Sequence, residues 1–281
     1  MQKKNILNSP RLMELKKHRR RIVLIKFLIS LLSLLAIFAS LAYISRTPSL
    51  NISDIEIIGN KVADAEMIKA DALKEIAGNY FFLFPKTNIF FYPKNSIKKE
   101  LESQFKRLKD VNLSVKAGVL QISLTEREPK YTWCGVTALD PTLSEKCYFM
   151  DEDGFIFDEA PYYSGEVYFK FYGSADTGTY FSKENFKQLI YFKDTLTAIG
   201  LKPVSLYVGD DGDVKIFLSA LNRTTTGPYI TFKIDADFQK LAENLETALS
   251  TEPLLSSFKN KYDSLLYIDL RFGNKVYYKF R

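Results

Sequence analysis

Two short acidic segments are the most obvious candidates for chemistry in this sequence. They are residues 151–154, Asp-Glu-Asp-Gly, and residues 210–213, Asp-Asp-Gly-Asp. Carboxylates at such spacing can bind Ca²⁺, but neither segment has the order of ligands, glycine and final glutamate that an EF-hand loop needs. Asp-Gly is also ordinary hairpin-turn chemistry. The sequence therefore favours turns over a calcium site at Asp151, Asp153, Asp210, Asp211 and Asp213, and we predict no metal and no cofactor.

Residues that act as nucleophiles or general bases are scarce. The one histidine, His18, precedes a long apolar segment, so the rest of the chain has no imidazole. A histidine triad, a histidine metal site and an imidazole base are therefore excluded there. Carboxylate pairs are scattered, and their positions in the sequence do not place two across a substrate. We predict that the protein is not an enzyme, with no catalytic residue and no small-molecule substrate.

The two cysteines, Cys134 and Cys147, both follow the apolar segment. An exported compartment permits a disulfide, which would close a short loop and contribute a few kcal/mol at most. Two buried thiols are the alternative. Neither arrangement is catalytic, because no histidine in this part of the chain can activate a thiolate.

Chemistry suited to recognition is concentrated at the end of the chain, where Lys275–Phe280 is rich in tyrosine. A final strand has one free edge unless another segment covers it, and its unpaired N–H and C=O groups can accept a partner strand. Main-chain hydrogen bonds then give affinity, and alternate side chains give selectivity. The candidate partner-binding residues are Asp269, Arg271, Lys275, Val276, Tyr277, Tyr278, Lys279 and Phe280.

The roles of these residues have two interpretations. Aromatic side chains of the last strand would supply contact area, and basic ones would meet acidic partner residues. Alternatively, Val276, Tyr278 and Phe280 belong to the core and the edge is capped internally. Asp269 and Arg271 would orient the edge, or they form a plain surface ion pair worth under about 1 kcal/mol.

The apolar pattern also predicts how the last two strands pair. A three-residue loop at 272–274 would place Leu270 opposite Val276 and Ile268 opposite Tyr278, apolar against apolar. A two-residue loop would shift the register by one position. We therefore expect the three-residue loop.

The apolar segment from Ile22 to Ile44 determines where these groups work. It holds 23 residues and one charge, Lys26. As a helix rising about 1.5 Å per residue it is roughly 34 Å long, enough for a bilayer core of about 30 Å. Eight Lys or Arg precede it. The positive-inside rule then places residues 1–21 in the cytoplasm and residues 45–281 outside a cell membrane that the chain crosses once.

A cleaved signal peptide is the alternative, because Ser40-Leu41-Ala42 is a small-x-small sequence that a signal peptidase accepts. However, the basic leader is long, and the apolar run exceeds the usual range of about 7–15 residues. Length therefore favours a retained anchor.

Charge divides the chain in the same way. The net charge is +6, but residues 1–44 carry +8 and the remainder carries −2. The basic balance therefore reflects topology and contact with anionic lipid headgroups, not a nucleic-acid surface.

Residues 50–127 follow the pattern strand, helix, helix, strand, strand. Apolar residues recur at helical spacing after Asp64 and after Ser96, each of which can cap a helix. A strand at 50–58 precedes them, and a hairpin at 111–124 alternates apolar with polar residues. Two amphipathic helices on one face of a small three-stranded sheet form a compact α+β unit.

An aromatic-rich connection separates the two helices of this unit. We expect it to pack in the helix core, with contact to a membrane or an integral partner as the alternative. Its aromatic residues are Tyr80, Phe81, Phe82, Phe84, Phe90, Phe91 and Tyr92.

Residues 128–281 predict a mainly antiparallel β domain with two helices. The helices are expected at 182–200 and 238–249. Alternating segments predict strands at 130–134, 146–150, 155–157, 166–172, 204–208, 214–218, 228–234, 265–271 and 275–280, with a loop containing Asp140-Pro141 after the first.

The order of these parts resembles one family, the bacterial cell-division proteins FtsQ/DivIB. Residues 55–60 look like the first strand and turn of its polypeptide-transport-associated (POTRA) domain, and residues 120–129 like that domain's last strand and junction. Residues 148–157 are similar to the family's D-x-x-G hairpin. The closing strands, 267–271 and 276–278, are the most specific match. The segment between Cys134 and Cys147 is not a hallmark of the family.

The resemblance covers most of the chain and implies its organisation. It implies a basic cytoplasmic tail at 1–21, a transmembrane helix at 22–44, a linker at 45–49, a POTRA domain at 50–127 and a C-terminal β domain at 128–281. It further implies a scaffold at the division septum, in the divisome, that links early division proteins to septal peptidoglycan synthesis. FtsB- and FtsL-like single-pass proteins would bind the β domain.

Two other functions are open at this point. One is a membrane-anchored cell-wall enzyme that uses two carboxylates, and the other is a POTRA protein of a secretion system. Long undivided cells after depletion would favour the scaffold, and cleavage of glycan or peptide by residues 47–281 would favour the enzyme. Association with an outer-membrane barrel would favour secretion.

Overall fold

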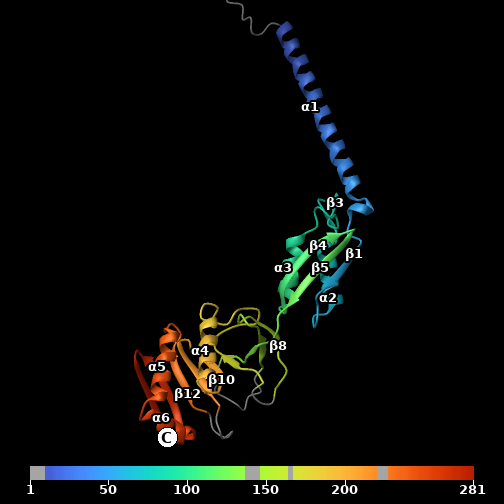
Figure 1. Ribbon diagram of the computed structural model, residues 1–281. Coiled ribbons are helices and arrows are strands. Elements are labelled where there is room, and N and C mark those ends of the chain that lie inside the picture. The colour runs from blue at the N-terminus through green and yellow to red at the C-terminus, as the bar shows by residue number, and fades with distance from the viewer. Residues whose placement is uncertain (1–9, 137–145, 164–166, 220–226) are drawn as a thin grey trace, which may run out of the picture. The chain divides into compact units, whose positions relative to one another are not determined.

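The computed structural model describes residues 10–136, 146–163, 167–219 and 227–281 (Figure 1). The chain divides into two compact units. The first unit is Met1–Gln104 with Asp110–Thr125, and the second unit is Phe105–Lys109 with Glu126–Arg281. The predicted loop with Asp140-Pro141 lies outside the described residues.

The first unit begins with one long helix, α1 (Pro10–Ser45). Its part from Met13 to Ser45 is long and apolar enough to span a membrane. We expected the transmembrane helix to begin at residue 22, after a basic tail, but the helix begins at Pro10. Proline is favoured at a first helical position, and the Leu, Lys, Arg and Glu residues that follow are good helix formers. The helix therefore continues through the basic segment ahead of the apolar one.

A short 3₁₀ turn (Pro48–Leu50) leads into a three-stranded sheet with strand order β1-β5-β4. Its strands are β1 (Asp54–Ile58), β4 (Leu108–Lys116) and β5 (Val119–Glu126), and β1 runs parallel to β5. The helices α2 (Ala65–Ile76) and α3 (Lys94–Gln104) bury their apolar stripes. The predicted strands and helices occur in the expected order, with two further short strands between the helices.

One of the two predicted helix caps is correct. The Asp64 carboxylate accepts a hydrogen bond from the N–H of Glu66 at 2.9 Å, as an N-cap does. Ser96 instead lies inside α3, and its hydroxyl donates to the Glu75 carboxylate at 2.5 Å. The helix starts earlier because Pro93, with its fixed φ, supplies the carbonyl that accepts the N–H of Ile97.

The aromatic connection contains a short hairpin made of two strands of two residues each, β2 (Asn79–Tyr80) and β3 (Phe84–Pro85). We expected its aromatic residues to form core. Four of them are instead exposed, namely Phe81, Phe82, Phe90 and Phe91. Phe81 and Phe82 lie in the turn between β2 and β3 and have positive φ angles of 48° and 62°.

The second unit is built on a nine-stranded, mostly antiparallel sheet. Its strand order is β14-β13-β12-β11-β10-β9-β6-β7-β8, with parallel pairs only at β6/β9, β9/β10 and β12/β13. The strands are β6 (Tyr131–Trp133), β7 (Tyr148–Met150), β8 (Ile156–Glu159), β9 (Lys170–Tyr172), β10 (Pro203–Val208), β11 (Asp213–Leu218), β12 (Tyr229–Lys233), β13 (Leu265–Phe272) and β14 (Lys275–Phe280).

Three helices, which contact one another in sequence order, cover one face of this sheet (Figure 1). They are α4 (Phe186–Ala198), α5 (Phe238–Ser250) and α6 (Leu254–Lys261), followed by a 3₁₀ turn, Tyr262–Ser264. The two predicted helices are confirmed. We did not predict α6. It has eight residues, and Leu254 is its one buried apolar residue, so it has no apolar stripe that a sequence pattern could reveal. The core lies between these helices and the sheet.

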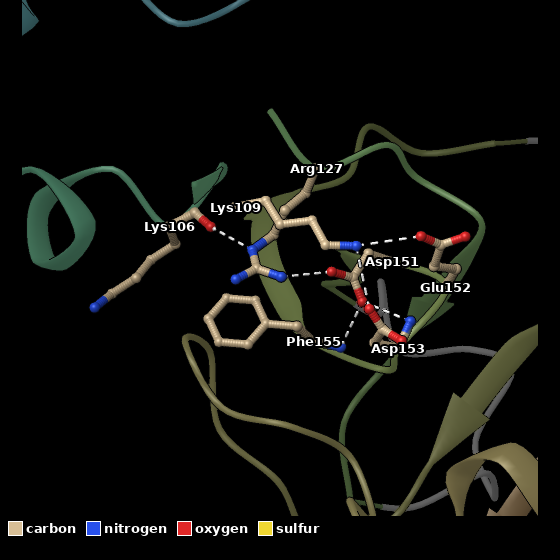
Figure 2. Close-up of polar contacts among 7 residues, drawn as sticks. All are labelled: Lys106, Lys109, Arg127, Asp151, Glu152, Asp153 and Phe155. Carbon is tan, nitrogen blue, oxygen red and sulfur yellow. Dashed lines mark hydrogen bonds and ion pairs between the residues drawn. The ribbon is translucent and has the colours of Figure 1, made fainter. Parts of the chain in front are cut away.

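A buried ion pair holds the turn between β7 and β8 (Figure 2). Arg127 Nη1 donates to the Asp151 carboxylate at 2.6 Å, and the Phe155 ring centroid lies 3.7 Å from the guanidinium carbon. The other carboxylate oxygen accepts the N–H groups of Asp153 and Phe155, each at 2.9 Å. The Asp-Glu-Asp-Gly segment therefore forms a turn in which Asp151 neutralises a buried arginine.

Candidate partner-binding edge

The nine-stranded sheet has two edges, and their main chains differ. At the β8 edge, residues 178–180 lie against the strand. The N–H of Ile156 donates to the carbonyl of Thr179 at 2.9 Å, and the N–H of Gly178 donates to the carbonyl of Ile156 at 2.7 Å. An isolated bridge between Phe155 and Tyr180 continues this contact. Residues 178–180 thus cover the β8 edge at Phe155 and Ile156, where the strand begins.

The β14 edge has no such cover within the described residues. Strand β14 pairs with β13 on one side, and no backbone hydrogen bond reaches its other side from any part of the chain that the structure describes. The strand is six residues long, against four for β8. A row of alternate N–H and C=O groups is therefore presented for pairing.

The last hairpin has one of the two expected pairs and a different turn, and the expected pair of Leu270 with Val276 is absent from the ladder. Ile268 pairs with Tyr278 as predicted, but Phe272 pairs with Lys275 across a two-residue turn. An irregularity between Asp269 and Phe272 reconciles the two. The extra residue that we assigned to the loop is therefore absorbed in strand β13.

The side chains of β14 divide between its two faces. Val276, Tyr278 and Phe280 are half-buried and pack against the core. The core alternative therefore holds for these three residues. Lys275, Tyr277 and Lys279 alternate with them and are exposed. Of the predicted binding residues in β14, only these three have exposed side chains.

Aromatic side chains that we did not single out continue this exposed face across the sheet. Lys279 pairs with Tyr267, Tyr267 with Tyr229, and Tyr229 with Phe217. The rings of Tyr229 and Tyr267 stack with centroids 5.9 Å apart. All three aromatic residues are half-buried, on the face opposite the buried residues of the same strands. The sequence signal was the period-two alternation within each strand, but the row itself depends on strand order.

Asp269 and Arg271 bind each other and not the strand edge. The Arg271 guanidinium donates two hydrogen bonds to the Asp269 carboxylate, Nε at 2.9 Å and Nη2 at 2.7 Å. Its Nη1 also donates to Asp213 at 2.6 Å. Lys233 Nζ lies 2.6 Å from the other oxygen of Asp213. These four residues form a charge network across β11, β12 and β13, in which Asp213 and Lys233 were not predicted.

The charge network shifts the pKa values of its members. The hydrogen bond from Lys233 is the largest cause of the lowered pKa of Asp213, burial partly opposes it, and Arg271 lowers it further. The same contact raises the pKa of Lys233, and the Asp269 carboxylate raises that of Arg271. Each of these three shifts favours the charged form of the side chain, which fits a structural role beside the edge.

A shallow groove of about 350 Å³ lies beside the inner face of β14. Val276 and Tyr278 line one side of it, and residues of α5 and of the α5–α6 connection line the other, namely Asn244, Thr247, Ala248, Thr251, Glu252, Pro253 and Leu254. The Asn244 side chain donates to the carbonyl of Gly273 at 3.2 Å, which holds the hairpin turn against the helix. Side chains added beyond β14 would lie next to this groove.

The acidic segments form turns, and the two cysteines bind each other. Asp211 accepts the N–H of Asp213 at 3.0 Å, which is turn geometry, as at Asp151. Among the residues that the structure describes, no group of three His, Cys, Asp or Glu is placed to hold a metal ion. Cys134 and Cys147 form a disulfide across the connection between β6 and β7.

The chemistry of this site suits main-chain hydrogen bonding to a partner strand and packing against its side chains. It presents main-chain hydrogen-bonding groups, exposed ammonium groups and a tyrosine ring, with a charge network behind them. Comparison with known protein families and with curated proteins found no match for this chain.

Proposed function

We propose that this protein is a single-pass membrane scaffold whose second unit binds a strand of a partner protein at β14. The observation that carries the proposal is the contrast between the two sheet edges. One edge is occupied by residues 178–180, and the other is open along six residues within the described chain. Soluble sheet proteins normally protect such an edge, so an open one at the end of a large sheet marks a binding site.

The charges of β14 specify the kind of partner. Lys275 and Lys279 lie on the same exposed face, with Tyr277 between them. A partner strand with carboxylates at alternate positions would complement them, and its apolar residues would contact the Tyr277 ring. Phe272, whose ring centroid lies 5.2 Å from that of Tyr277, would extend the apolar contact.

The biological setting that we propose is the bacterial division septum. The order of α1, a small α+β unit and a large β unit resembles the FtsQ/DivIB arrangement, in which a POTRA domain follows the anchor, and this resemblance supports the proposal. In that setting the partners of β14 are FtsB- and FtsL-like single-pass proteins, and the protein links early division components to septal peptidoglycan synthesis. Two features support this proposal, the basic segment ahead of the apolar part of α1 and the open terminal strand.

Site-specific crosslinking of the full-length protein tests the proposal. A photoreactive amino acid at position 277 is expected to capture a single-pass protein in cells, and the same group at Glu159, on the β8 edge, is expected to capture none. Depletion is expected to give long undivided cells with normal bulk wall chemistry. Equal capture at both edges would contradict the binding site, and normal division after depletion would contradict the setting.

A further inference from the structure

Four exposed phenylalanines lie in the segment of residues 81–91, which is hydrogen-bonded to the end of α1. Phe81 and Phe82 are 87% and 92% exposed, and Phe90 and Phe91 are 72% and 58% exposed. Leu83, 45% exposed, lies between the two pairs in sequence. A soluble domain rarely exposes so many large apolar side chains together, and such a patch marks a contact with a protein or a membrane.

Hydrogen bonds tie this aromatic segment to the last turn of α1. The buried Asn88 side chain donates to the carbonyl of Ser45 at 3.1 Å. Arg46 Nη2 donates to the carbonyl of Phe82 at 3.2 Å. Asn51, which follows the helix, donates to the same Ser45 carbonyl at 2.9 Å. The segment that bears the phenylalanines is therefore fixed beside residues 45–51.

The length of α1 sets the depth of that position. The apolar segment Ile22–Ile44 just exceeds a bilayer core of about 30 Å. Ser45 and Arg46 then lie at a membrane–water interface, as does Tyr43, which is 79% exposed in the last turn of the helix. Aromatic side chains are enriched at that level, and a basic side chain such as Arg46 reaches the headgroups from it.

Two of the phenylalanines have a strained backbone conformation. Phe81 and Phe82 are consecutive residues with positive φ, a conformation that bulky side chains avoid. A strained conformation that exposes apolar rings is retained where the exposed rings are used.

We propose that Phe81, Phe82, Phe90 and Phe91 insert into the interface of the bilayer that α1 crosses, and so dock the first unit on the membrane surface. The occupant of this surface is lipid, because the patch is tied to the point where the helix leaves the membrane. Phenylalanine and leucine are the side chains with which interfacial segments bury an apolar face among headgroups and acyl chains. This inference rests on the part of the proposed function in which α1 spans a membrane.

Depth-dependent quenching of tryptophan fluorescence tests the inference with the full-length protein. Four variants are reconstituted separately in vesicles of phosphatidylethanolamine and phosphatidylglycerol. The vesicles contain no brominated lipid, lipid brominated near the headgroup end of the acyl chain, or lipid brominated deep in the chain. Phe82→Trp reports the patch and Leu32→Trp reports the middle of α1. Met67→Trp, at a 58% exposed position of α2, is the matched control. The emission of the native Trp133 is subtracted by using the parent protein.

We expect Trp emission at position 82 to be largely lost with shallow brominated lipid, and emission at position 67 to be unchanged. Position 32 should be quenched by lipid brominated deep in the chain. Phe90→Trp provides a second reporter and should behave like Phe82→Trp. Because only lipid and this protein are present, quenching cannot come from a protein partner.

Two results would overturn the inference, and they are distinguishable. If position 32 is quenched while positions 82 and 90 behave like position 67, the anchor stands and membrane docking fails. If position 32 is not quenched either, the membrane-spanning part of the proposed function fails, and the docking inference fails with it.

Discussion

The two edges of the nine-stranded sheet differ in whether another segment of the described chain pairs with them. At the β8 end, residues 178–180 pair with the strand, Arg127 and Asp151 form a buried ion pair, and a disulfide joins the connection between β6 and β7. At the β14 end, the charge network of Asp213, Lys233, Asp269 and Arg271 lies behind the strand, and the described residues leave its outer main chain without a partner.

The difference gives one end of the sheet a network of paired groups and leaves the strand at the other end with free main-chain groups in the described chain. Buried charges that are paired and hydrogen-bonded fix one geometry, and breaking them is costly. An open strand keeps its main-chain groups for another molecule, and lysines on it disfavour pairing with a second copy of itself. We therefore expect mutations at the β8 end to change stability and mutations at the β14 end to change binding.

The largest expected effect is at the closed end. Arg127→Ala leaves the Asp151 carboxylate buried without its cation, which should reduce the free energy of unfolding by about 3–5 kcal/mol. Urea unfolding followed by near-ultraviolet circular dichroism measures this loss. Lys146→Ala removes only the exposed 4.0 Å contact with Glu159 and is the control, with an expected loss below about 1 kcal/mol. Equal losses in the two variants would mean that the ion pair does not stabilise this end.

The disulfide should have the next largest effect. Replacing both Cys134 and Cys147 with serine opens a loop with a sequence separation of 13. The loop-closure relation gives a loss of about 3 kcal/mol in the free energy of unfolding. Binding at β14 should be unchanged, because the bond lies at the other end of the sheet order. A binding defect in a folded double variant would show that the two ends are coupled.

At the open end, Tyr277→Asp is expected to weaken partner binding with little change in stability. Tyr277 is 48% exposed, and a carboxylate there opposes the acidic partner that Lys275 and Lys279 favour. An interface aromatic residue of this kind contributes about 1–2 kcal/mol, or roughly tenfold in Kd. Titration of the full-length protein with its captured partner measures it, and Glu159→Arg on the β8 edge serves as the matched control.

Tyr278→Asp, or deletion of residues 275–281, is the more disruptive version of the same experiment. Both should also weaken binding while the first unit stays folded. However, Tyr278 packs against the core, so the second unit itself would lose stability. Unchanged affinity after the deletion would exclude β14 as the binding edge.

The smallest expected effect is a pH dependence at the charge network. The pKa of Asp213 is lowered in the folded protein, mainly by the hydrogen bond with Lys233. Its contribution to stability is therefore present above the ordinary value of 3.8 and is lost as pH falls through the lower folded value. Asp213→Asn should reduce stability by about 1 kcal/mol at neutral pH. Unfolding curves should converge with those of the parent in acid, and a constant difference at all pH values would contradict the assignment.

Much of the fold was predictable, because its signals are local. Alternation over 111–124 gave the hairpin of β4 and β5, and helical spacing after Asp64 gave α2 with its cap. The pairing of Ile268 with Tyr278 followed from matching apolar faces across a short turn. Each of these features involves residues that are close in sequence, so side-chain type and spacing are sufficient.

The candidate site was predicted only in part, because its chemistry depends on distant strands. The position of β14 at the chain end indicated the edge, and alternation implied two faces. Nothing in the sequence near Asp269 and Arg271 indicated that Asp213 and Lys233 would reach them from β11 and β12. The prediction for the aromatic segment was wrong for a related reason. Hydrophobicity favours burial, but which side chains the core covers depends on tertiary packing, and Phe81 and Phe82 lie in an uncovered turn.

By itself, the sequence determined one long apolar helix, an α+β unit and a strand-rich second half, since these depend on local periodicity and length. The tertiary structure alone decided which strand lies at each edge of the large sheet and which edge the chain covers. Strand order brings residues 178–180 to β8 and leaves β14 without a cover in the described chain. Edge exposure is a property of the closed hydrogen-bond network, which exists only once distant strands have paired.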